Sequence, residues 1–222
     1  LRESKDKVCI GSCSLNSMDY ADDVTLLCTT APGLQRLIDM CAIYAHKWRF
    51  RFGIKKTKCM SLSGMNLVSQ PIWYLDGEPI ENVTCLEILG VQFDNKNSVH
   101  VTSRIEKCKR SYFGLRDAGL AYPGCAADVK AYLWNTMCQP VLMYGLDCVN
   151  ISDKSLQQLE STQGNFIKRC LGLSKRSRSS SLLIAMGVQK VEEKLRQSVA
   201  SLLKRIFIVE SSAQELTHYF MS

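Results

Sequence analysis

The chain has 222 residues, 46% hydrophobic and 22% charged, with a formal net charge of +7. This composition is typical of a globular chain that buries a core, as one large or two small domains. Eleven cysteines without a C-x-x-C pair and only three histidines argue against a zinc site. An odd cysteine count without a signal peptide favours an intracellular protein of the cytoplasm or nucleus, not a secreted one, with free and mostly buried thiols.

Basic residues are concentrated in the second half of the chain. Residues 1–100 carry 11 Lys and Arg against 11 Asp and Glu, whereas residues 101–222 carry 17 against 10. The surplus indicates a polyanionic partner, although a surplus that only aids solubility is an equal alternative. The longest apolar region, 132–151, contains Pro140 and Asp147, so we expect no membrane span.

The first hundred residues predict strands around one helix. Two short strands, MDYA and VTLL, would meet at a tight turn with Asp22 and Asp23 at its tip, because Asp is a poor strand former. A helix after TTAPG would end near Gly53 and cover one face of the sheet. Its predicted core face comprises Leu34, Leu37, Ile38, Cys41, Ala45 and Trp48.

After this helix, KKTKCMSLSG predicts a basic turn and a short strand. Residues 71–94 predict two or three antiparallel strands with a turn at Asp76 and Gly77. The fold class predicted for this half is α+β.

From Val101 onward the pattern predicts helices. The first has an apolar face of Ile105, Cys108, Tyr112 and Leu115, and the second, over about 126–147, would be kinked or divided at Pro140. Ser152 and Asp153 would cap the third, and SKRSRSSS is predicted to be a flexible basic loop before a last helix over 191–209. The candidates for phosphate contacts are Arg104, Lys107, Lys109, Arg110, Lys168, Arg169, Lys175, Arg176 and Arg178.

The acid pair at the predicted hairpin tip suits a divalent cation. Hard ions such as Mg²⁺ prefer carboxylate oxygens and relieve the repulsion between Asp22 and Asp23. Two such ions about 4 Å apart can activate a 3′ hydroxyl and stabilise a leaving pyrophosphate. An ordinary Asp-containing turn explains the tetrapeptide equally well.

Five segments in order resemble non-LTR (LINE-type) retrotransposon reverse transcriptases. Tyr20-Ala21-Asp22-Asp23 resembles the Y-A-D-D box, and CAIYAHKW with GIKKTKCM resembles the next palm segment. EILGVQFD is similar to the primer-grip hairpin, and QPVLMYGLDCV and LQQLESTQGNFIKRCLGL are similar to the thumb and post-thumb. The resemblance covers nearly the whole chain. It implies the C-terminal portion of a polymerase palm over 1–98 and an all-α thumb and post-thumb region over 99–222.

The resemblance also implies roles for individual residues. Asp22 and Asp23 would hold Mg²⁺ or Mn²⁺, and Lys56 would stabilise charge on the triphosphate or donate a proton to pyrophosphate. Tyr20 would lie beneath the nucleotide or primer end. The primer backbone would be positioned by Leu89, Gly90 and Val91. Ordinary strand packing is an equally good explanation of Tyr20. A solvated basic turn is an equally good explanation of Lys56. The implied partners are an RNA template, a DNA primer and a dNTP.

Some features depart from the family pattern. Gly53 and Ile54 replace the usual Asn-Pro, and Ile88 replaces the primer-grip tyrosine. The first metal-binding aspartate of the family lies well upstream of the Y-A-D-D box, whereas only 19 residues precede Tyr20. We therefore expect a piece of a longer nucleotidyltransferase that is inactive alone. The alternatives are a helical module that binds nucleic acid without sequence specificity and a poorly folded retroelement relic.

Overall fold

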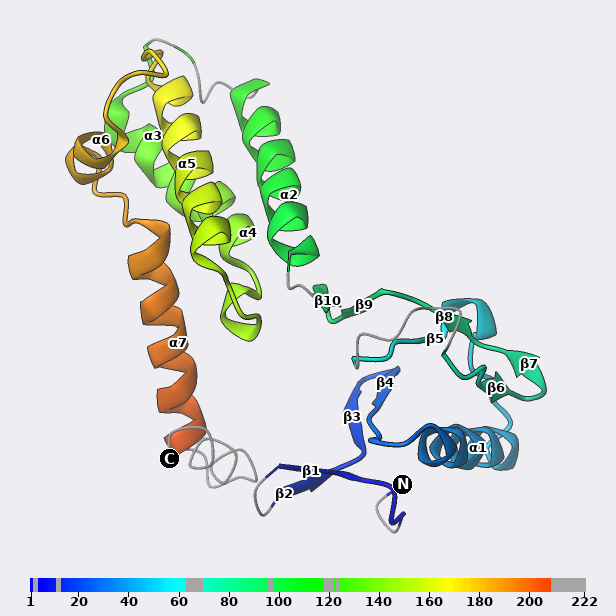
Figure 1. Cartoon of the computed structure of the whole chain (residues 1–222). Helices are drawn as coiled ribbons and strands as arrows, with labels where there is room; N and C mark the ends of the chain where they lie inside the picture. The colour runs from blue at the N-terminus through cyan, green and yellow to red at the C-terminus, as the bar shows by residue number, and fades with distance from the viewer. Residues whose placement is uncertain are drawn as a thin grey trace. The chain divides into compact units, whose positions relative to one another are not determined.

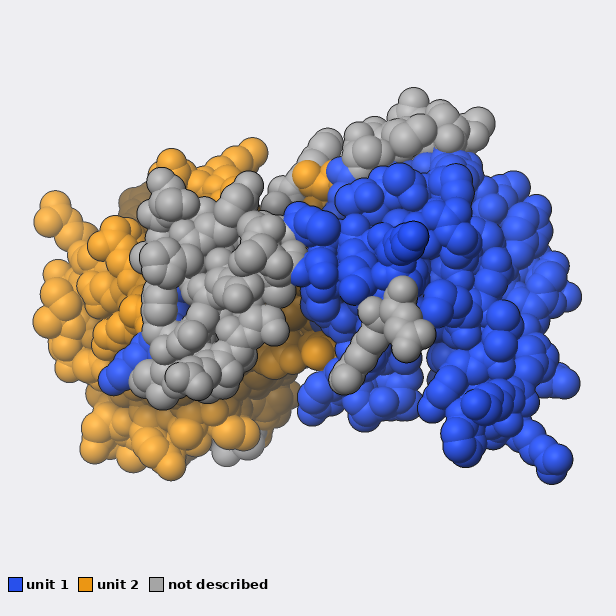
Figure 2. Space-filling view, turned by 90° about the horizontal axis from the view of Figure 1, so that it is seen from below, with its two compact units in different colours: residues 1–88, 203–222 blue, residues 89–202 orange. Residues whose placement is uncertain are grey.

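The computed structural model describes residues 1, 4–10, 13–62, 70–95, 98–117, 122 and 124–208 (Figure 1). Of these described residues, 54% are helical and 15% are in strands, which confirms a mixed α+β fold in general terms. The chain divides into two compact units, the first made of Leu1–Ile88 with Leu203–Ser222 and the second of Leu89–Leu202 (Figure 2). The functional boundary expected between residues 98 and 99 stays a prediction.

The strands are short and pair two by two. The antiparallel pairs of the first unit are β1 (Val8–Ile10) with β2 (Cys13–Leu15), β3 (Ser17–Tyr20) with β4 (Asp23–Leu26), and β6 (Tyr74–Leu75) with β7 (Glu78–Pro79). The prediction of antiparallel strands is wrong for β5 (Lys58–Cys59) and β8 (Glu81–Asn82), which pair in parallel. The long connection between β5 and β8 allows this arrangement, since parallel strands need a crossover. Within the described residues these pairs are separate two-stranded sheets.

Helix α1 (Ala31–Lys47) begins as predicted and ends earlier than predicted. The Thr30 side chain caps it by accepting a hydrogen bond from the Gly33 backbone N–H at 3.2 Å. It stops because Arg49 adopts a left-handed φ of 58°, so the predicted end near Gly53 is wrong. Trp48 then lies outside the helix and is 61% exposed, which contradicts its predicted place in the core.

A small core underlies α1 and the strand pairs of the first unit. Its buried hydrophobic residues are Ile38, Cys59, Trp73, Leu75 and Ile80. The Trp73 indole N–H donates to the Ala31 carbonyl at 3.3 Å, which joins the segment before β6 to the start of α1. The turn at Asp76 and Gly77 is confirmed, with positive φ at both residues.

The second unit is helical. Its elements are β10 (Val91–Asp94), α2 (Val99–Leu115), α3 (Ala127–Leu133), α4 (Gln139–Met143), α5 (Asp153–Cys170), α6 (Ser179–Ala185) and most of α7 (Val191–Ile208). The predicted cap of α5 is confirmed, because the Ser152 side chain accepts from the Ser155 N–H. The predicted last helix is confirmed over 191–208, and its predicted end at residue 209 lies outside the described residues.

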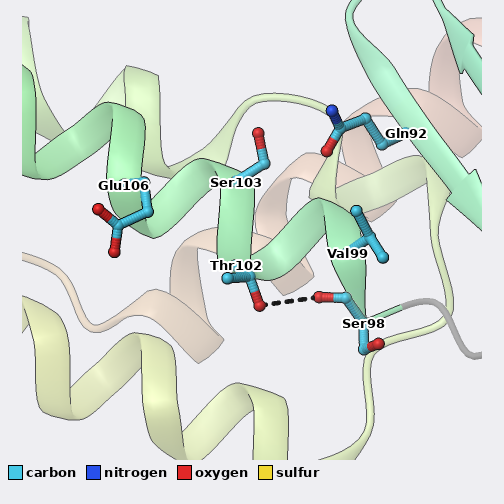
Figure 3. Close-up of a pocket in the computed structure, with 6 residues that line it drawn as sticks. All are labelled: Gln92, Ser98, Val99, Thr102, Ser103 and Glu106. Atoms are coloured by element: carbon cyan, nitrogen blue, oxygen red, sulfur yellow. Dashed lines mark hydrogen bonds between the residues drawn. The ribbon is translucent and has the colours of Figure 1, made fainter. Parts of the chain in front are cut away.

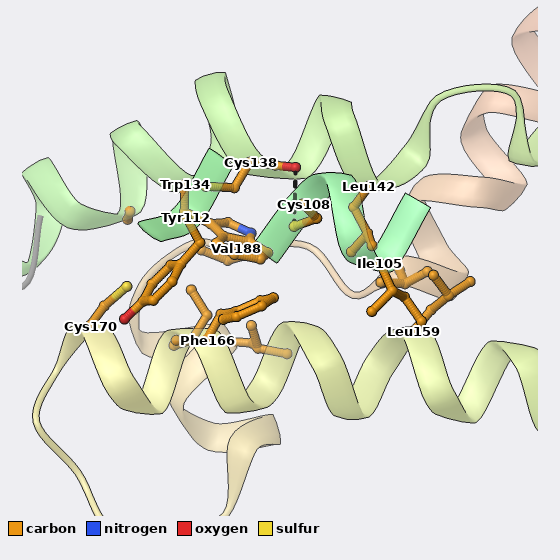
Figure 4. Close-up of a cluster of buried hydrophobic side chains, with 14 of the residues drawn as sticks. Ile105, Cys108, Tyr112, Trp134, Cys138, Leu142, Leu159, Phe166, Cys170 and Val188 are labelled. Carbon is orange, nitrogen blue, oxygen red and sulfur yellow. Dashed lines mark hydrogen bonds between the residues drawn. The ribbon is translucent and has the colours of Figure 1, made fainter. Parts of the chain in front are cut away.

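Aromatic rings fill the centre of the helical unit (Figure 4). The Phe166 ring stacks on Tyr112 at 4.7 Å and lies 5.9 Å from Trp134, which is fully buried. Ile105, Cys108 and Tyr112 of the predicted α2 face are all buried. The apolar periodicity of α2 therefore identified its core face correctly.

The predicted kink at Pro140 is a change of helix type. A π-helical turn, Trp134–Cys138, separates α3 from α4, and Pro140 lies in the first turn of α4. Side chains of α2 satisfy carbonyls here, since Ser111 Oγ donates to the Met137 oxygen at 3.1 Å and Cys108 Sγ to the Cys138 oxygen at 3.6 Å. Proline removes a helix donor, and these two side chains bring donors from a neighbouring helix to the same region.

The ten cysteines whose state the structure describes are free, but most of them are not buried. Among the ten cysteines whose state the structure describes, the buried ones are Cys59, Cys108, Cys138 and Cys170. The prediction of mostly buried thiols is wrong because the others lie on partly or fully exposed faces. In the described part of the chain, no helix is long and apolar enough to cross a bilayer.

Candidate functional site

The acid pair lies at the end of the β3–β4 hairpin, as predicted. Tyr20 pairs with Asp23 across the strands, so Ala21 and Asp22 form a two-residue turn. Ala21 has a φ of 54°, a region that glycine adopts at little cost and an L side chain adopts with strain. The backbone thus departs from ordinary geometry beside the two carboxylates, which is common at functional sites.

The tip of this hairpin is open to solvent. Asp22 and Asp23 are exposed, and the Tyr20 side chain, which shares a face with Asp23, is 67% exposed. Tyr20 has two interpretations, packing in a strand and supporting a bound base, and its contacts in the described structure favour neither. Within the described residues, no hydrogen bond or ion pair joins Lys56 to either acid, and no group of three or more His, Cys, Asp or Glu side chains gathers.

Two adjacent carboxylates fit Mg²⁺ or Mn²⁺ as part of a site. Mg²⁺ commonly takes one or two protein carboxylates and completes its shell with water and substrate phosphates. The tip offers such a pair, with both side chains exposed and no competing cation bonded to them in the described chain. The donor set fits the ion but does not by itself make a closed cage.

Lys56 lies in the short 3-10 helix Ile54–Lys56. Its backbone N–H donates to the Gly53 carbonyl at 2.8 Å, and Thr57 Oγ1 donates to the same oxygen. Ile54 packs against the core of the first unit, whereas Lys55 and Lys56 are exposed. The local fold thus presents Lys56 to solvent on a basic turn.

The segment predicted to grip a primer is a second strained hairpin. Strand β9 (Cys85–Ile88) pairs with β10, and both turn residues, Leu89 and Gly90, have positive φ, of 49° and 79°. Two successive positive φ values are the signature of a type I′ turn. Leu89 is 46% exposed at the tip, whereas Val91 is buried.

The end of α4 holds this turn in place. The Tyr144 hydroxyl donates to the Leu89 carbonyl at 2.8 Å, and a Cβ on Gly90 would lie 3.4 Å from the Tyr144 ring. Gly145 has a φ of 69°, and a Cβ there would approach Val91 to 2.6 Å. Only glycine fits both the backbone and the space at 145.

A buried histidine adds a further link. His100 Nδ1 accepts from the Gln92 N–H at 3.2 Å, and Nε2 lies 2.9 Å from the Tyr144 carbonyl, to which it donates. Because one nitrogen accepts and the other donates, the ring is the neutral Nε2-H tautomer. Sequence analysis missed this histidine, although a lone His in an apolar helix face near a glycine-containing turn was a usable signal.

The basic candidates differ in their surroundings. Arg104 is only 6% exposed, and its guanidinium lies 5.1 Å from the Tyr144 ring centroid, so its predicted role as a surface phosphate contact is wrong. Lys109 pairs with Glu106, and Lys168 donates to the Lys175 carbonyl, while Lys107 is half-buried. The exposed candidates are Arg110, Arg169, Lys175, Arg176 and Arg178.

Two surface pockets lie beside helices α1 and α2. One, of about 350 Å³, lies along the start of α2 and is lined by Gln92, Ser98, Val99, Thr102, Ser103 and Glu106 (Figure 3). The other, of about 360 Å³, lies beside the first turn of α1 and is lined by residues of 31–35 and 71–74. Neither of these two pockets includes a predicted site residue.

Comparisons with known proteins found no relative. No family model matches the chain, and neither the curated proteins nor the solved structures contain a match. The functional assignment therefore rests on the ordered sequence segments and on the geometry of the two hairpins.

Proposed function

We propose that this chain is the C-terminal part of the palm, with the thumb, of an RNA-directed DNA polymerase of the non-LTR retrotransposon type. The observation that carries the proposal is the exposed two-residue turn that presents Asp22 and Asp23, with Tyr20 paired to Asp23. A second support is the bond from Tyr144 to the 88–91 turn, because it joins two of the segments that resemble the family.

In this proposal each exposed turn has one task. Asp22 and Asp23 would hold Mg²⁺ or Mn²⁺, which when bound supplies activation of a primer 3′ hydroxyl and charge stabilisation at pyrophosphate. Lys56 would attract the triphosphate of a dNTP, and Leu89, Gly90 and Val91 would support the DNA primer on its RNA template. Further metal ligands would come from outside the described residues. We therefore expect no nucleotidyl transfer by these 222 residues alone.

Metal binding at the hairpin tip tests the proposal directly. We expect Mn²⁺, followed by electron paramagnetic resonance, to bind the chain weakly and to lose roughly tenfold or more in affinity in Asp22→Asn and Asp23→Asn. Asp19→Asn is the matched control, because Asp19 lies on the same hairpin but pairs with Val24 away from the turn. Equal binding by the Asp22→Asn/Asp23→Asn double variant would refute the metal site.

Primer extension tests the expected dependence on further residues. With an RNA template, a DNA primer, dNTPs and Mg²⁺ or Mn²⁺, we expect no product from residues 1–222. A longer form that carries a further palm aspartate ahead of Leu1 should extend the primer and lose this activity in Asp22→Asn. Synthesis by the 222-residue chain alone would contradict the first expectation, and full activity of the longer Asp22→Asn form would contradict the second.

A second candidate function is a helical module that binds nucleic acid without reading sequence. It is favoured by the exposed cations at and beyond the end of α5, namely Arg169, Lys175, Arg176 and Arg178. Affinity for an RNA/DNA duplex should then fall steeply with salt, with a log–log slope of about −0.9 for each phosphate contacted. A flat salt response would exclude this function. For the relic hypothesis, circular dichroism that shows no cooperative melt would be the supporting result.

A further inference from the structure

Aromatic side chains gather where α1 ends. The Tyr44 ring centroid lies 6.2 Å from that of Trp48 and 6.1 Å from that of Phe50, and Phe50 lies 5.3 Å from Phe52. The Tyr44–Phe50 and Phe50–Phe52 pairs meet edge to face, with interplanar angles of 71° and 73°, and the Tyr44–Trp48 pair is tilted at 50°. None of these three pairs is stacked face to face, and the Lys47 ammonium lies 5.9 Å from the Trp48 ring centroid.

The left-handed residue at 49 creates this cluster. The Arg49 N–H donates to the His46 carbonyl at 3.3 Å and the Phe50 N–H to the Ala45 carbonyl at 3.1 Å, which ends the helix and reverses the chain. The reversal returns Phe50 to Tyr44 on the last turns of the helix. Phe52 is partly buried against the core of the first unit and anchors the segment.

The rings of this cluster are unusually exposed for their size. Tyr44 is 57% exposed, Trp48 61% and Phe50 41%. Single exposed apolar residues are normal, but adjacent exposed rings that pack on one another mark an interaction surface. The structure thus keeps three large rings available to a partner.

The same segment is strongly basic. Residues 40–75 contain six Lys and Arg and no Asp or Glu. Among the described residues of this stretch, His46 hydrogen-bonds to Asp76 and Lys58 forms an ion pair with Glu81. The remaining cations, Lys47, Arg49, Arg51, Lys55 and Lys56, are exposed. Residues 1–100 have no net charge as a whole, because their Asp and Glu residues lie outside 40–75 and balance the positive charge of this stretch.

We propose that this aromatic–basic surface, made of Tyr44, Lys47, Trp48, Arg49, Phe50 and Arg51, binds single-stranded nucleic acid. Exposed rings offer faces on which unpaired bases stack, and the cations between them contact the phosphates. Bases of a duplex are already stacked on each other, so the surface selects unpaired strands. Rings and cations alternate along the sequence over residues 47–52. The inference goes beyond the proposed polymerase function and uses none of its site residues.

Intrinsic fluorescence offers a direct measurement, because the other two tryptophans are buried. Trp73 is 5% exposed and Trp134 0%, so quenching by an unlabelled oligothymidylate or oligouridylate reports on Trp48. Anisotropy of a labelled oligonucleotide then gives the affinity of variants. We expect Trp48→Ala to lose roughly 5- to 100-fold in affinity, the effect of one stacked base, and Trp48→Phe to retain most of it.

Arg49→Gly removes a charge at a position whose backbone suits glycine, so the turn should be kept. We expect it to reduce the slope of log affinity against log salt by about 0.7 for single strands. The matched controls lie in the other unit: Tyr132→Ala removes a ring that is 66% exposed, and Lys154→Ala removes an exposed cation. Both should bind oligonucleotides like the unaltered chain.

Several outcomes would overturn the inference. One is that a duplex of the same length binds as tightly as the single strand, and another is that Trp48→Ala leaves the affinity unchanged. A third is Trp48-dependent binding to phosphatidylserine vesicles without affinity for oligonucleotides, which would identify a membrane surface. Circular dichroism of each variant confirms the fold. The Asp22→Asn/Asp23→Asn chain should bind oligonucleotides normally. The oligonucleotide-binding experiment can therefore be interpreted even if the polymerase proposal fails. Loss of binding only in the Trp48 and Arg49 variants would support the aromatic–basic surface independently of that proposal.

Discussion

The two units of this chain are built in opposite ways. Among the described residues, the helical unit buries a cluster of 16 hydrophobic side chains, whereas the first unit buries a cluster of five under α1. The first unit also carries the exposed hairpin tip and the exposed rings that follow α1. Burial is the main source of stability, so the helical unit should hold its fold more firmly, while the first unit displays its chemistry at the surface.

Buried polar groups reinforce the contrast. In the helical unit, the Gln163 and Gln139 side chains both donate to the Gln189 carbonyl, at 2.9 and 3.2 Å, and the buried Lys130 ammonium donates to the Cys170 carbonyl at 2.9 Å. Lysine at the C-terminal carbonyls of α5 is favoured by the helix dipole. Such bonds specify one packing arrangement of the helices, because a helix shift would leave these groups without partners.

The largest effect is expected from a cavity in the helical core. Trp134→Ala should destabilise the chain by about 3–5 kcal/mol, because a fully buried indole packed on Phe166 is removed. Urea denaturation followed by circular dichroism measures this change. Tyr132→Ala, two residues away on an exposed face, should cost less than about 1 kcal/mol. A similar loss in the free energy of unfolding for both variants would contradict the assignment of Trp134 to the core.

The turn at the end of α4 gives the next largest effect. Gly145→Ala should cost about 2 kcal/mol or more, since alanine both strains the positive φ and meets Val91. Gly172→Ala is the matched control, because Gly172 has a similar φ of 68° but open space around it, and it should cost about 1 kcal/mol. Amide hydrogen exchange at residues 88–92 should increase in Gly145→Ala only. Equal costs would show that the contact with Val91 carries no energy.

Thiol labelling compares the two units in one experiment. Burial raises the pKa of Cys59 to about 11 and that of Cys108 to about 12, so neither thiol reacts at pH 8 before its surroundings open. We expect iodoacetamide to label the exposed Cys9 and Cys148 first. Cys59, in the smaller core, should follow at least about tenfold faster than Cys108, by peptide mass spectrometry. Labelling of Cys108 before Cys59 would reverse the proposed order of stability.

The smallest effect concerns an ion pair at the surface of the first unit. Hydrogen bonds from Arg36 to Asp6, at 2.5 and 2.8 Å, lower the pKa of that carboxyl below its ordinary value of 3.8. A lowered folded-state pKa stabilises the fold above the unfolded-state pKa, and this contribution is lost as the pH falls through the folded value. Arg36→Met should raise the Asp6 pKa in an NMR titration, while Arg196→Met should leave it unchanged. No shift in Arg36→Met would disprove the pairing.

The sequence by itself determined most elements of the chain and the position of its acid pair. Apolar periodicity located α1, α2 and α5, serine capping located the start of α5, and the Asp-Gly pair located the turn after β6. These features depend on residues a few positions apart, so local preferences decide them. The β3–β4 hairpin follows from the same kind of information.

Only the tertiary structure decided which side chains are buried and which segments meet. Arg104 looked like a surface cation but lies under Tyr144, and Trp48 looked like a core residue but is exposed because Arg49 ends the helix before it. The parallel pairing of β5 with β8 and the bond from Tyr144 to Leu89 join residues 23 or more positions apart. No local pattern encodes such contacts, since they depend on how separate elements pack once each has formed.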